Sequence, residues 1–276
     1  MSAASTACAA NFLAAYTWFC RRTAPGPVPW SASGGADEEP LLLFCADDSG
    51  LTDFNLIMPF RVPEAMPPGA LSAEALGRGI RAGLAFFARR GAPFALWLPE
   101  GCVLAPEDEA LFPERESHMG MTADLAGMAF DIPSVPGLCV RKIRESRDLA
   151  DLAELIGLGW DVDSEPYRTL FAARSGELLR PDSRKSFYLA LLDGQPVGCL
   201  ESYDDPASNT VGLYYCAVHP MFRRRGIARI MQARVLAEFA GAGRRTAAAL
   251  AAPIERRCLA RLGFSECGCW TERLHP

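Results

Sequence analysis

One short segment constrains this chain more than any other, because it joins an apolar strand pattern to an amphipathic helix pattern through a basic turn. The strand pattern covers Val211 to Val218, and the helix pattern covers Ile227 to Ala240. Between them the chain reads His-Pro-Met-Phe-Arg-Arg-Arg-Gly, so Arg223 and Gly226 lie at a predicted strand-to-helix junction. Alternation of strands and helices of this kind is typical of an α/β architecture.

The junction has the chemistry of a phosphate site. The first N–H groups of a helix have no carbonyl partner within it, and the helix dipole adds positive charge there. Gly226 lets the backbone turn sharply and approach an anion, while Ala228 keeps the first turn uncrowded. Three consecutive arginines add permanent charge. A solvated basic turn is the alternative, but the combined pattern of strand, glycine, small residue and helix favours anion binding.

Residues 223–228 fit the pattern Arg/Gln-x-x-Gly-x-Gly/Ala, and they resemble the acyl-CoA pyrophosphate loop of the GNAT superfamily of N-acetyltransferases. The resemblance extends over residues 140–276 and implies a catalytic domain from 139 to 276 with acetyl-CoA as its co-substrate. In this family the cofactor contacts the end of the fourth strand and the loop. The matching residues here are Cys216, Ala217, Val218, Arg223, Arg224, Arg225, Gly226, Ile227, Ala228 and Arg229.

The predicted elements of the second half follow the same family order. The dipeptide Asp193-Gly194 predicts a two-residue hairpin, whereas the alanine-rich strand at 246–251 depends on the family pattern alone. The resemblance implies an α/β (α+β) fold: a mixed, mostly antiparallel sheet flanked by helices, whose fourth and fifth strands splay apart beside the pantetheine. Strands are predicted over 139–144, 186–192, 197–203, 211–218, 246–251 and 264–271, and helices over 148–158, 165–173, 227–240 and between Pro253 and Gly263.

Residues 1–138 are predicted to form a separate domain, which resembles more loosely the degenerate N-terminal half of two-domain (tandem) GNAT proteins. It has no phosphate loop, because Arg78-Gly79 lies inside a helical pattern, so we expect no CoA binding here. Its expected role is to wall the acceptor site. Asp53, Asn55 and Trp97 are candidates to face that site, although a structural role is the favoured interpretation. Helices are predicted over 9–22, 73–90 and 107–111, strands over 41–45, 54–60 and 93–98, and either a strand or a short helix over 121–130.

The charge distribution also divides the chain. Residues 1–138 carry 8 basic and 16 acidic side chains, whereas residues 139–276 carry 20 basic and 17 acidic ones. The change of sign supports two units, and neither half is basic enough to predict a nucleic-acid surface. The acidic first half is explained by solubility more readily than by attraction of a cationic acceptor.

Cysteine usage and hydropathy bear on the compartment. No apolar run approaches the roughly 18 residues of a membrane span, and no basic residue precedes Arg21 as a secretory signal requires. Ten cysteines without a Cys-x-x-Cys pair, together with only three histidines, predict reduced core thiols and no metal site. We therefore expect a cytoplasmic protein without a membrane partner, of an oligomeric state that the sequence does not reveal.

The family resemblance implies direct transfer of an acetyl group from the thioester to the amine of a small-molecule or peptide acceptor. Glu201, an acidic residue within the central strands, is the candidate base, with a solvent-exposed strand-edge residue as the alternative. The backbone N–H of Val218 would polarise the thioester carbonyl. Tyr215 is the candidate acid, and Tyr203 and Tyr214 are further hydroxyl donors nearby.

One position departs from the family pattern. The usual acid is a tyrosine four residues before the Gly-Phe pair, and Gly263-Phe264 places Leu259 there. Because leucine has no proton to give, two hypotheses remain: an acyl-CoA-dependent N-acyltransferase, or a non-catalytic acyl-CoA-binding or regulatory module. The acidic turn of Asp161, Asp163 and Glu165 either receives an amine or is simply solvated, and the second interpretation is favoured.

Overall fold

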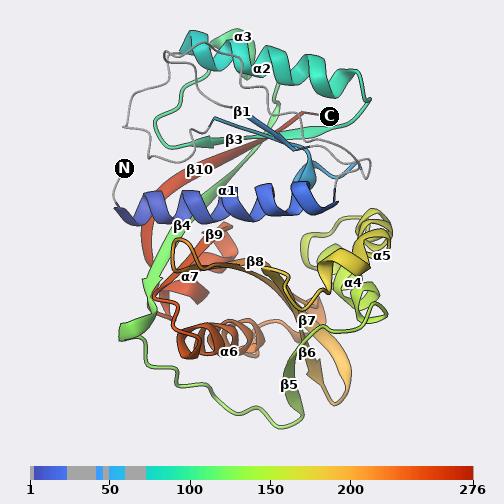
Figure 1. Cartoon of the computed structure of the whole chain (residues 1–276), viewed down its shortest axis with the longest axis vertical. Helices are drawn as coiled ribbons and strands as arrows, with labels where there is room; N and C mark the ends of the chain where they lie inside the picture. The colour runs from blue at the N-terminus through green and yellow to red at the C-terminus, as the bar shows by residue number, and fades with distance from the viewer. Residues whose placement is uncertain (1–2, 24–41, 46–49, 60–72, 276) are drawn as a thin grey trace.

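The computed structural model describes residues 3–23, 42–45, 50–59 and 73–275. Within these residues ten strands form one sheet in the order β1-β2-β3-β10-β4-β9-β8-β7-β6-β5 (Figure 1). The strands are β1 (Leu42–Cys45), β2 (Leu56–Pro59), β3 (Phe94–Pro99), β4 (Glu114–Asp124), β5 (Leu138–Lys142), β6 (Lys185–Leu192), β7 (Gln195–Asp205), β8 (Thr210–Val218), β9 (Thr246–Ala251) and β10 (Ser265–His275). The α-helices are α1 (Ala3–Thr23), α2 (Ala73–Ala88), α3 (Pro106–Glu109), α4 (Asp148–Trp160), α5 (Glu165–Leu178), α6 (Ile227–Gly241) and α7 (Pro253–Ala260).

The sheet is mixed and mostly antiparallel, as predicted. Only β2 with β3 and β8 with β9 run parallel among the described pairs. The second half has the predicted order β5-α4-α5-β6-β7-β8-α6-β9-α7-β10. At its hairpin, Asp193 and Gly194 have φ angles of 50° and 83°, the left-handed values that a tight two-residue turn needs.

Strands from the two halves of the sequence alternate in this sheet. The C-terminal strand β10 lies between β3 and β4, and β4 in turn pairs with β9. Both β3 and β4 come from residues 1–138, so the sheet continues across the predicted boundary at 138/139, and that division remains a prediction. Strand β4 begins at Glu114 and is followed by a 3-10 helix at Leu125–Gly127, where the sequence left strand and helix open.

Helices cover both faces of the sheet. We call the face beneath α1, α4 and α5 the α1 face; its core includes Phe12 and Phe19 of α1 and Phe171 of α5. On the opposite face, α6 and α7 contribute Met231, Leu236 and Leu259 to a second core, and α2 covers β2 and β3 in a third. Figure 1 shows α1 crossing the middle of the molecule with α4 and α5 beside one end of it.

Helix α1 is longer than the predicted 9–22 and docks closely on β8. The Tyr214 hydroxyl donates to Asn11 Oδ1 at 2.7 Å, and a Cβ at Gly212 would lie only 2.1 Å from the same oxygen. This glycine therefore allows helix and strand to approach. The first-half strand predicted over 54–60 is a 3-10 helix, η1 (Thr52–Phe54), followed by β2, while Phe60 lies outside the described residues. Across the described part of the chain, none of the helices is long and apolar enough to cross a membrane.

Candidate acyl-CoA site and acceptor side

The parallel pair β8 and β9 diverges partway along β8. Pairing runs from Thr210 with Thr246 to Leu213 with Ala249, and residues 214–218 have no partner on β9. On its other side, β8 remains paired with β7 up to Val218. The structure thus confirms the predicted splay and leaves one edge of β8 open within the described sheet.

The backbone of Val218 points toward this open edge. The next residue, His219, donates its N–H to the Val197 carbonyl of β7 at 2.9 Å. Because successive residues of a strand direct their N–H and C=O groups to opposite sides, the Val218 N–H points away from β7. This is the orientation that the predicted contact with a thioester carbonyl requires.

A β-bulge marks the start of the divergence. The register between β7 and β8 shifts between the pairs Cys199–Ala217 and Glu201–Tyr214. Tyr215 lies in this bulge with a φ of 47°, which a bulky residue rarely adopts. Bulges redirect side chains and end regular pairing. The side chain of Tyr215 therefore does not follow the regular alternation of β8.

The predicted loop then enters α6 through a left-handed glycine. Gly226 is the N-cap of α6 with φ 80°, and the Ile230 N–H bonds its carbonyl at 3.0 Å. The N–H groups of Ile227, Ala228 and Arg229 precede any carbonyl that the helix can offer them. A Cβ on Gly226 would meet no atom within 4 Å, so the space beside it is open.

The three arginines do not share one role. Arg223 donates to the Val218 carbonyl at 3.1 Å and to the Gly159 carbonyl at 2.9 Å, so it holds the loop against the C-terminus of α4. Arg225 lies over the Phe222 ring at 5.2 Å, and Arg224 is exposed with a φ of 65°. Arg224 and Arg225 therefore remain the side chains available to an anion, while Arg223 positions the loop.

The candidate base Glu201 is enclosed rather than solvent-exposed. Its side chain is 3% exposed, and Lys185 Nζ lies 2.5 Å from its Oε1. Burial raises the pKa of Glu201, and the Lys185 charge and hydrogen bond oppose that rise. The alternative of a strand-edge glutamate in solvent is therefore wrong. The carboxylate of Glu201, the predicted base, is already engaged in a buried ion pair with Lys185.

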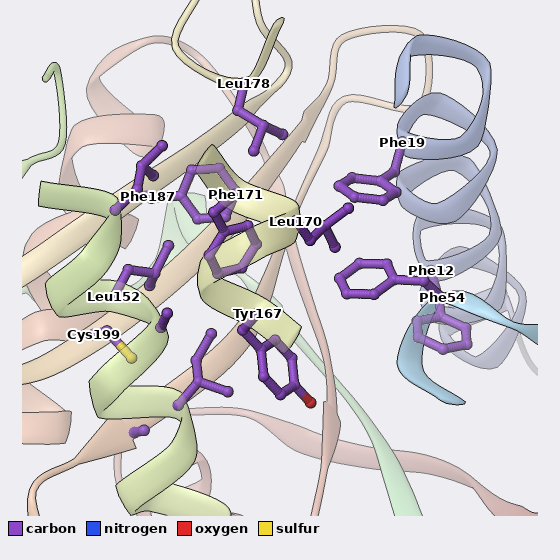
Figure 2. Packing of buried hydrophobic residues seen from close by; sticks show 14 of the residues in the cluster. Phe12, Phe19, Phe54, Leu152, Tyr167, Leu170, Phe171, Leu178, Phe187 and Cys199 are labelled. Atoms are coloured by element: carbon purple, nitrogen blue, oxygen red, sulfur yellow. The ribbon is translucent and has the colours of Figure 1, made fainter. Parts of the chain in front are cut away.

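A second carboxylate on the α1 face lies beside the bulge. Asp53 of η1 accepts a hydrogen bond from the Tyr167 hydroxyl of α5. Figure 2 shows Tyr167 with its hydroxyl directed away from Phe171, on the side toward Phe54. Phe54 stacks with Tyr215 at 6.5 Å, and burial together with the Asp53 charge raises the pKa of Tyr215 well above 10. The buried Tyr215 hydroxyl has no hydrogen-bond partner among the described residues.

Further polar groups of β4 and β10 lie near this carboxylate. His118 Nε2 is 3.1 Å from Glu272 and 3.9 Å from Glu116, and these three residues could together hold a metal ion. Glu272 also raises the pKa of Asp53, whereas His118 lowers it. Trp97 is 7% exposed and packs on His118 at 4.6 Å, and Asn55 is fully buried. Trp97 and Asn55 therefore fit the structural role that the sequence favoured for all three candidates. Asp53 fits it less well, because it remains partly exposed.

The position at which the family usually has its acid is occupied by a buried leucine. Leu259 on α7 is 2% exposed and belongs to the core beneath α6. One turn earlier, Glu255 accepts the Ala252 N–H at 3.2 Å, and burial raises the pKa of Glu255 to about 7. This glutamate therefore caps its own helix, and the His118 charge lowers its pKa as it lowers that of Asp53.

Sequence reasoning missed Tyr167, His118 and Glu272 as neighbours of the candidate site. The partner of each is more than 100 residues away in the sequence, as for Tyr167 and Asp53. The acidic turn that sequence reasoning did consider is exposed at Asp161, Asp163 and Glu165, as the solvated alternative requires. The available signal was weak, because Tyr167 is buried on α5 whereas His118 and Glu272 are half-buried among other polar residues of β4 and β10.

Comparison with known families supports the assignment of the second half. Residues 149–264 match the model of the acetyltransferase (GNAT) family. This segment contains the divergent strands, the bulge and the loop at the start of α6. Residues 149–264 therefore form an acetyltransferase domain of the GNAT family, and family and fold together support acyl-CoA N-acyltransferase activity in general.

Solved structures extend the likeness in fold to nearly the whole chain. A GCN5-related N-acetyltransferase from Kribbella flavida has a TM-score of 0.64 at 13% identity, covering 97% of this chain and 95% of that one. A functionally unknown conserved protein from Staphylococcus epidermidis has a TM-score of 0.65 at 11% identity, with coverages of 90% and 95%. A tandem GNAT protein from the clavulanic acid biosynthesis pathway has a TM-score of 0.52 at 14% identity, covering 79% and 74%. No curated protein matches the sequence.

Proposed function

We propose that this protein transfers an acetyl group directly from acetyl-CoA to an amine of a small-molecule or peptide acceptor. The observation that carries the proposal is the continuity of residues 214–229: an open strand edge, a bulge and an exposed helix N-terminus follow one another in one segment. That order offers amide groups to a pantetheine and then N–H groups to a pyrophosphate. Domain 139–276 is proposed to bind acetyl-CoA, and 1–138 to be a degenerate half without a phosphate site.

The roles of individual residues follow from their positions. The N–H groups of Ile227, Ala228 and Arg229 would bind the pyrophosphate beside Gly226, with added charge from Arg224 and Arg225. Backbone groups of Cys216, Ala217 and Val218 would bind the pantetheine arm, and the Val218 N–H would stabilise the developing oxyanion. Tyr215 stays protonated at neutral pH, because burial and nearby negative charge raise its pKa, so it can serve as the acid.

A non-catalytic acyl-CoA-binding module is the second candidate. The observation in its favour is Leu259, an apolar and fully packed residue at the position of the family's usual acid. The two candidates differ in one result, since only a transferase releases free CoA thiol when an amine is added.

Calorimetric titration of the full chain with acetyl-CoA tests the shared part of both candidates. One site per chain is expected, and Gly226→Glu should abolish binding through its bulk and negative charge. Gly243→Glu is the matched control: Gly243 follows α6 with a φ of 86° and, like Gly226, has no atom within 4 Å of an added Cβ. Retained affinity in a folded Gly226→Glu variant would refute the phosphate site, and two sites would assign one to residues 1–138.

A further inference from the structure

We propose that Asp53, supplied by the first half of the chain, is the general base of the acceptor subsite, and that this subsite takes a primary amine in its ammonium form. The inference rests on the proposed transferase function and adds to it a catalytic residue. No hydrogen bond or ion pair joins Asp53 to the phosphate loop among the described residues, so its role can be tested apart from acetyl-CoA binding.

The position of Asp53 follows from the strands that surround it. Strand β9 ends at Ala251, opposite Met119, so the segment of β4 before Met119 continues beyond the end of β9. Beyond the end of β9 there is therefore a gap in the sheet, which is bordered by β8 on one side and by β4 on the other. Phe54, the residue after Asp53, stacks on Tyr215 of β8 at 6.5 Å, and Asp53 itself accepts a hydrogen bond from Tyr167 of α5, which places it beside this gap on the α1 face.

The carboxylate of Asp53 retains capacity for a ligand. It accepts a hydrogen bond from Tyr167, and Tyr215 lies near enough to lower its pKa, whereas an ionised carboxylate has about four lone-pair sites. Among the described residues no lysine or arginine forms a salt bridge with Asp53, in contrast to Glu201 and Lys185. A cation that enters beside Tyr215 would supply the missing counter-charge.

Aromatic rings complete a surface suited to an ammonium group. Phe54 and Trp160 contact the Tyr215 ring at 6.5 and 6.0 Å, and Tyr16 is close enough for the Asp53 charge to raise its pKa after the larger effect of burial. The faces of aromatic rings attract cations. A neutral alcohol gains neither the ion pair nor this attraction, so the lining favours an amine.

The proposed step is balanced in protons and bonds. The bound ammonium gives one proton to the Asp53 carboxylate, and the neutral nitrogen attacks the thioester carbon. The C–N bond forms and the C–S bond breaks, while the Val218 N–H stabilises the oxygen. The thiolate receives a proton from Tyr215 or water, and the second proton of the nitrogen restores that donor. Asp53 then releases its proton to solvent.

The electrostatic surroundings support Asp53 as a base near neutral pH. Burial raises the pKa of Asp53 to about 6, with Glu272 raising it further and Tyr167, Tyr215 and His118 lowering it. At pH 7 the group is mostly ionised, yet it holds a proton more strongly than an ordinary aspartate does. Both properties suit a general base.

The test uses the full chain with three variants: Asp53→Asn, Tyr167→Phe and, as a matched control on the exposed turn, Asp163→Asn. Thiol release is measured with acetyl-CoA and n-butylamine, 1,4-diaminobutane or lysine, and with 1-butanol as the neutral analogue. Asp53→Asn should lower kcat by about 10²–10⁴-fold without changing acetyl-CoA affinity. The control should behave as the wild type, and butanol should not react.

Tyr167→Phe separates a positioning role from a merely structural one. Its hydrogen bond lowers the pKa of Asp53, so losing it should move the acid limb of kcat/KM, expected near pH 6, to higher pH. An Asp53→Asn variant with wild-type kcat would overturn the assignment. Acetyl-CoA binding without thiol release for any amine would overturn both Asp53 and the transferase, whereas absent acetyl-CoA binding would refute the proposed function itself.

Discussion

Glu201 and Asp53 are two carboxylates on the same face of the sheet, yet their surroundings lead to opposite expectations. Glu201 on β7 is enclosed with Lys185, whose Nζ also lies 5.0 Å from the Phe19 ring. Asp53 is partly exposed and has hydroxyl neighbours and a second carboxylate nearby instead of a lysine. A buried charge with a partner is held in place, whereas one without a partner is ready to exchange a proton. We therefore assign a structural role to Glu201 and a catalytic role to Asp53.

The largest effect is expected from breaking the ion pair. Lys185→Met leaves Glu201 as an uncompensated buried charge, which should lower the free energy of unfolding by about 3–5 kcal/mol. Urea unfolding at pH 7 measures it. Lys142→Met, at a partly exposed lysine of the edge strand β5, should change stability by no more than about 0.5 kcal/mol. Equal stability of Lys185→Met and the wild type would mean that Glu201 does not depend on this partner.

Replacing Asp53 is expected to change the free energy of unfolding by a smaller amount than Lys185→Met does, and to raise it instead of lowering it. Its pKa is about 6 in the folded protein against 3.8 as the ordinary value, so between these values the folded chain holds a proton that the unfolded chain releases. Stability contributed by this group is therefore present below about pH 4 and is lost as pH rises to about 6. The loss is at most about 3 kcal/mol.

Asp53→Asn should remove this pH-dependent loss, because asparagine resembles the protonated acid. The variant should be at least as stable as the wild type at pH 8 and similar to it at pH 4. Thermal unfolding at pH 4, 6 and 8 measures the difference between the two proteins. The same dependence on pH in both would show that Asp53 is not the group responsible.

The two carboxylates also differ in how far the sequence predicts their surroundings. The hairpin at Asp193-Gly194 pairs Phe187 with Glu201, so Lys185 lies two residues away on the same face. The spacing of these residues around the hairpin was therefore enough to predict the ion pair, although the prediction for Glu201 as a base did not consider Lys185. The contact between Asp53 and Tyr167 spans 114 residues and depends on how the two halves pack, which no local pattern encodes.

The same distinction holds for the fold. Elements with strong local signals, such as the hairpin, α6 and its glycine cap, agree with the sequence to within about two residues. The position of β4 between β9 and β10 depends on pairings with distant strands, so neither alternation nor turn chemistry reveals it. The alanine strand β9 formed because its neighbours β4 and β8 bury it on both sides, despite its poor intrinsic preference.

The smallest stability effect is expected from replacing both members of the ion pair, and this variant tests the comparison most severely. Lys185→Met with Glu201→Leu removes two buried charges together, so stability should return to about the wild-type value. If Asp53 is the base, the double variant should also retain kcat. A stable double variant whose kcat falls by about 10²-fold or more would assign the base to Glu201 instead. Because the fold is intact in either case, the activity alone decides between the two carboxylates.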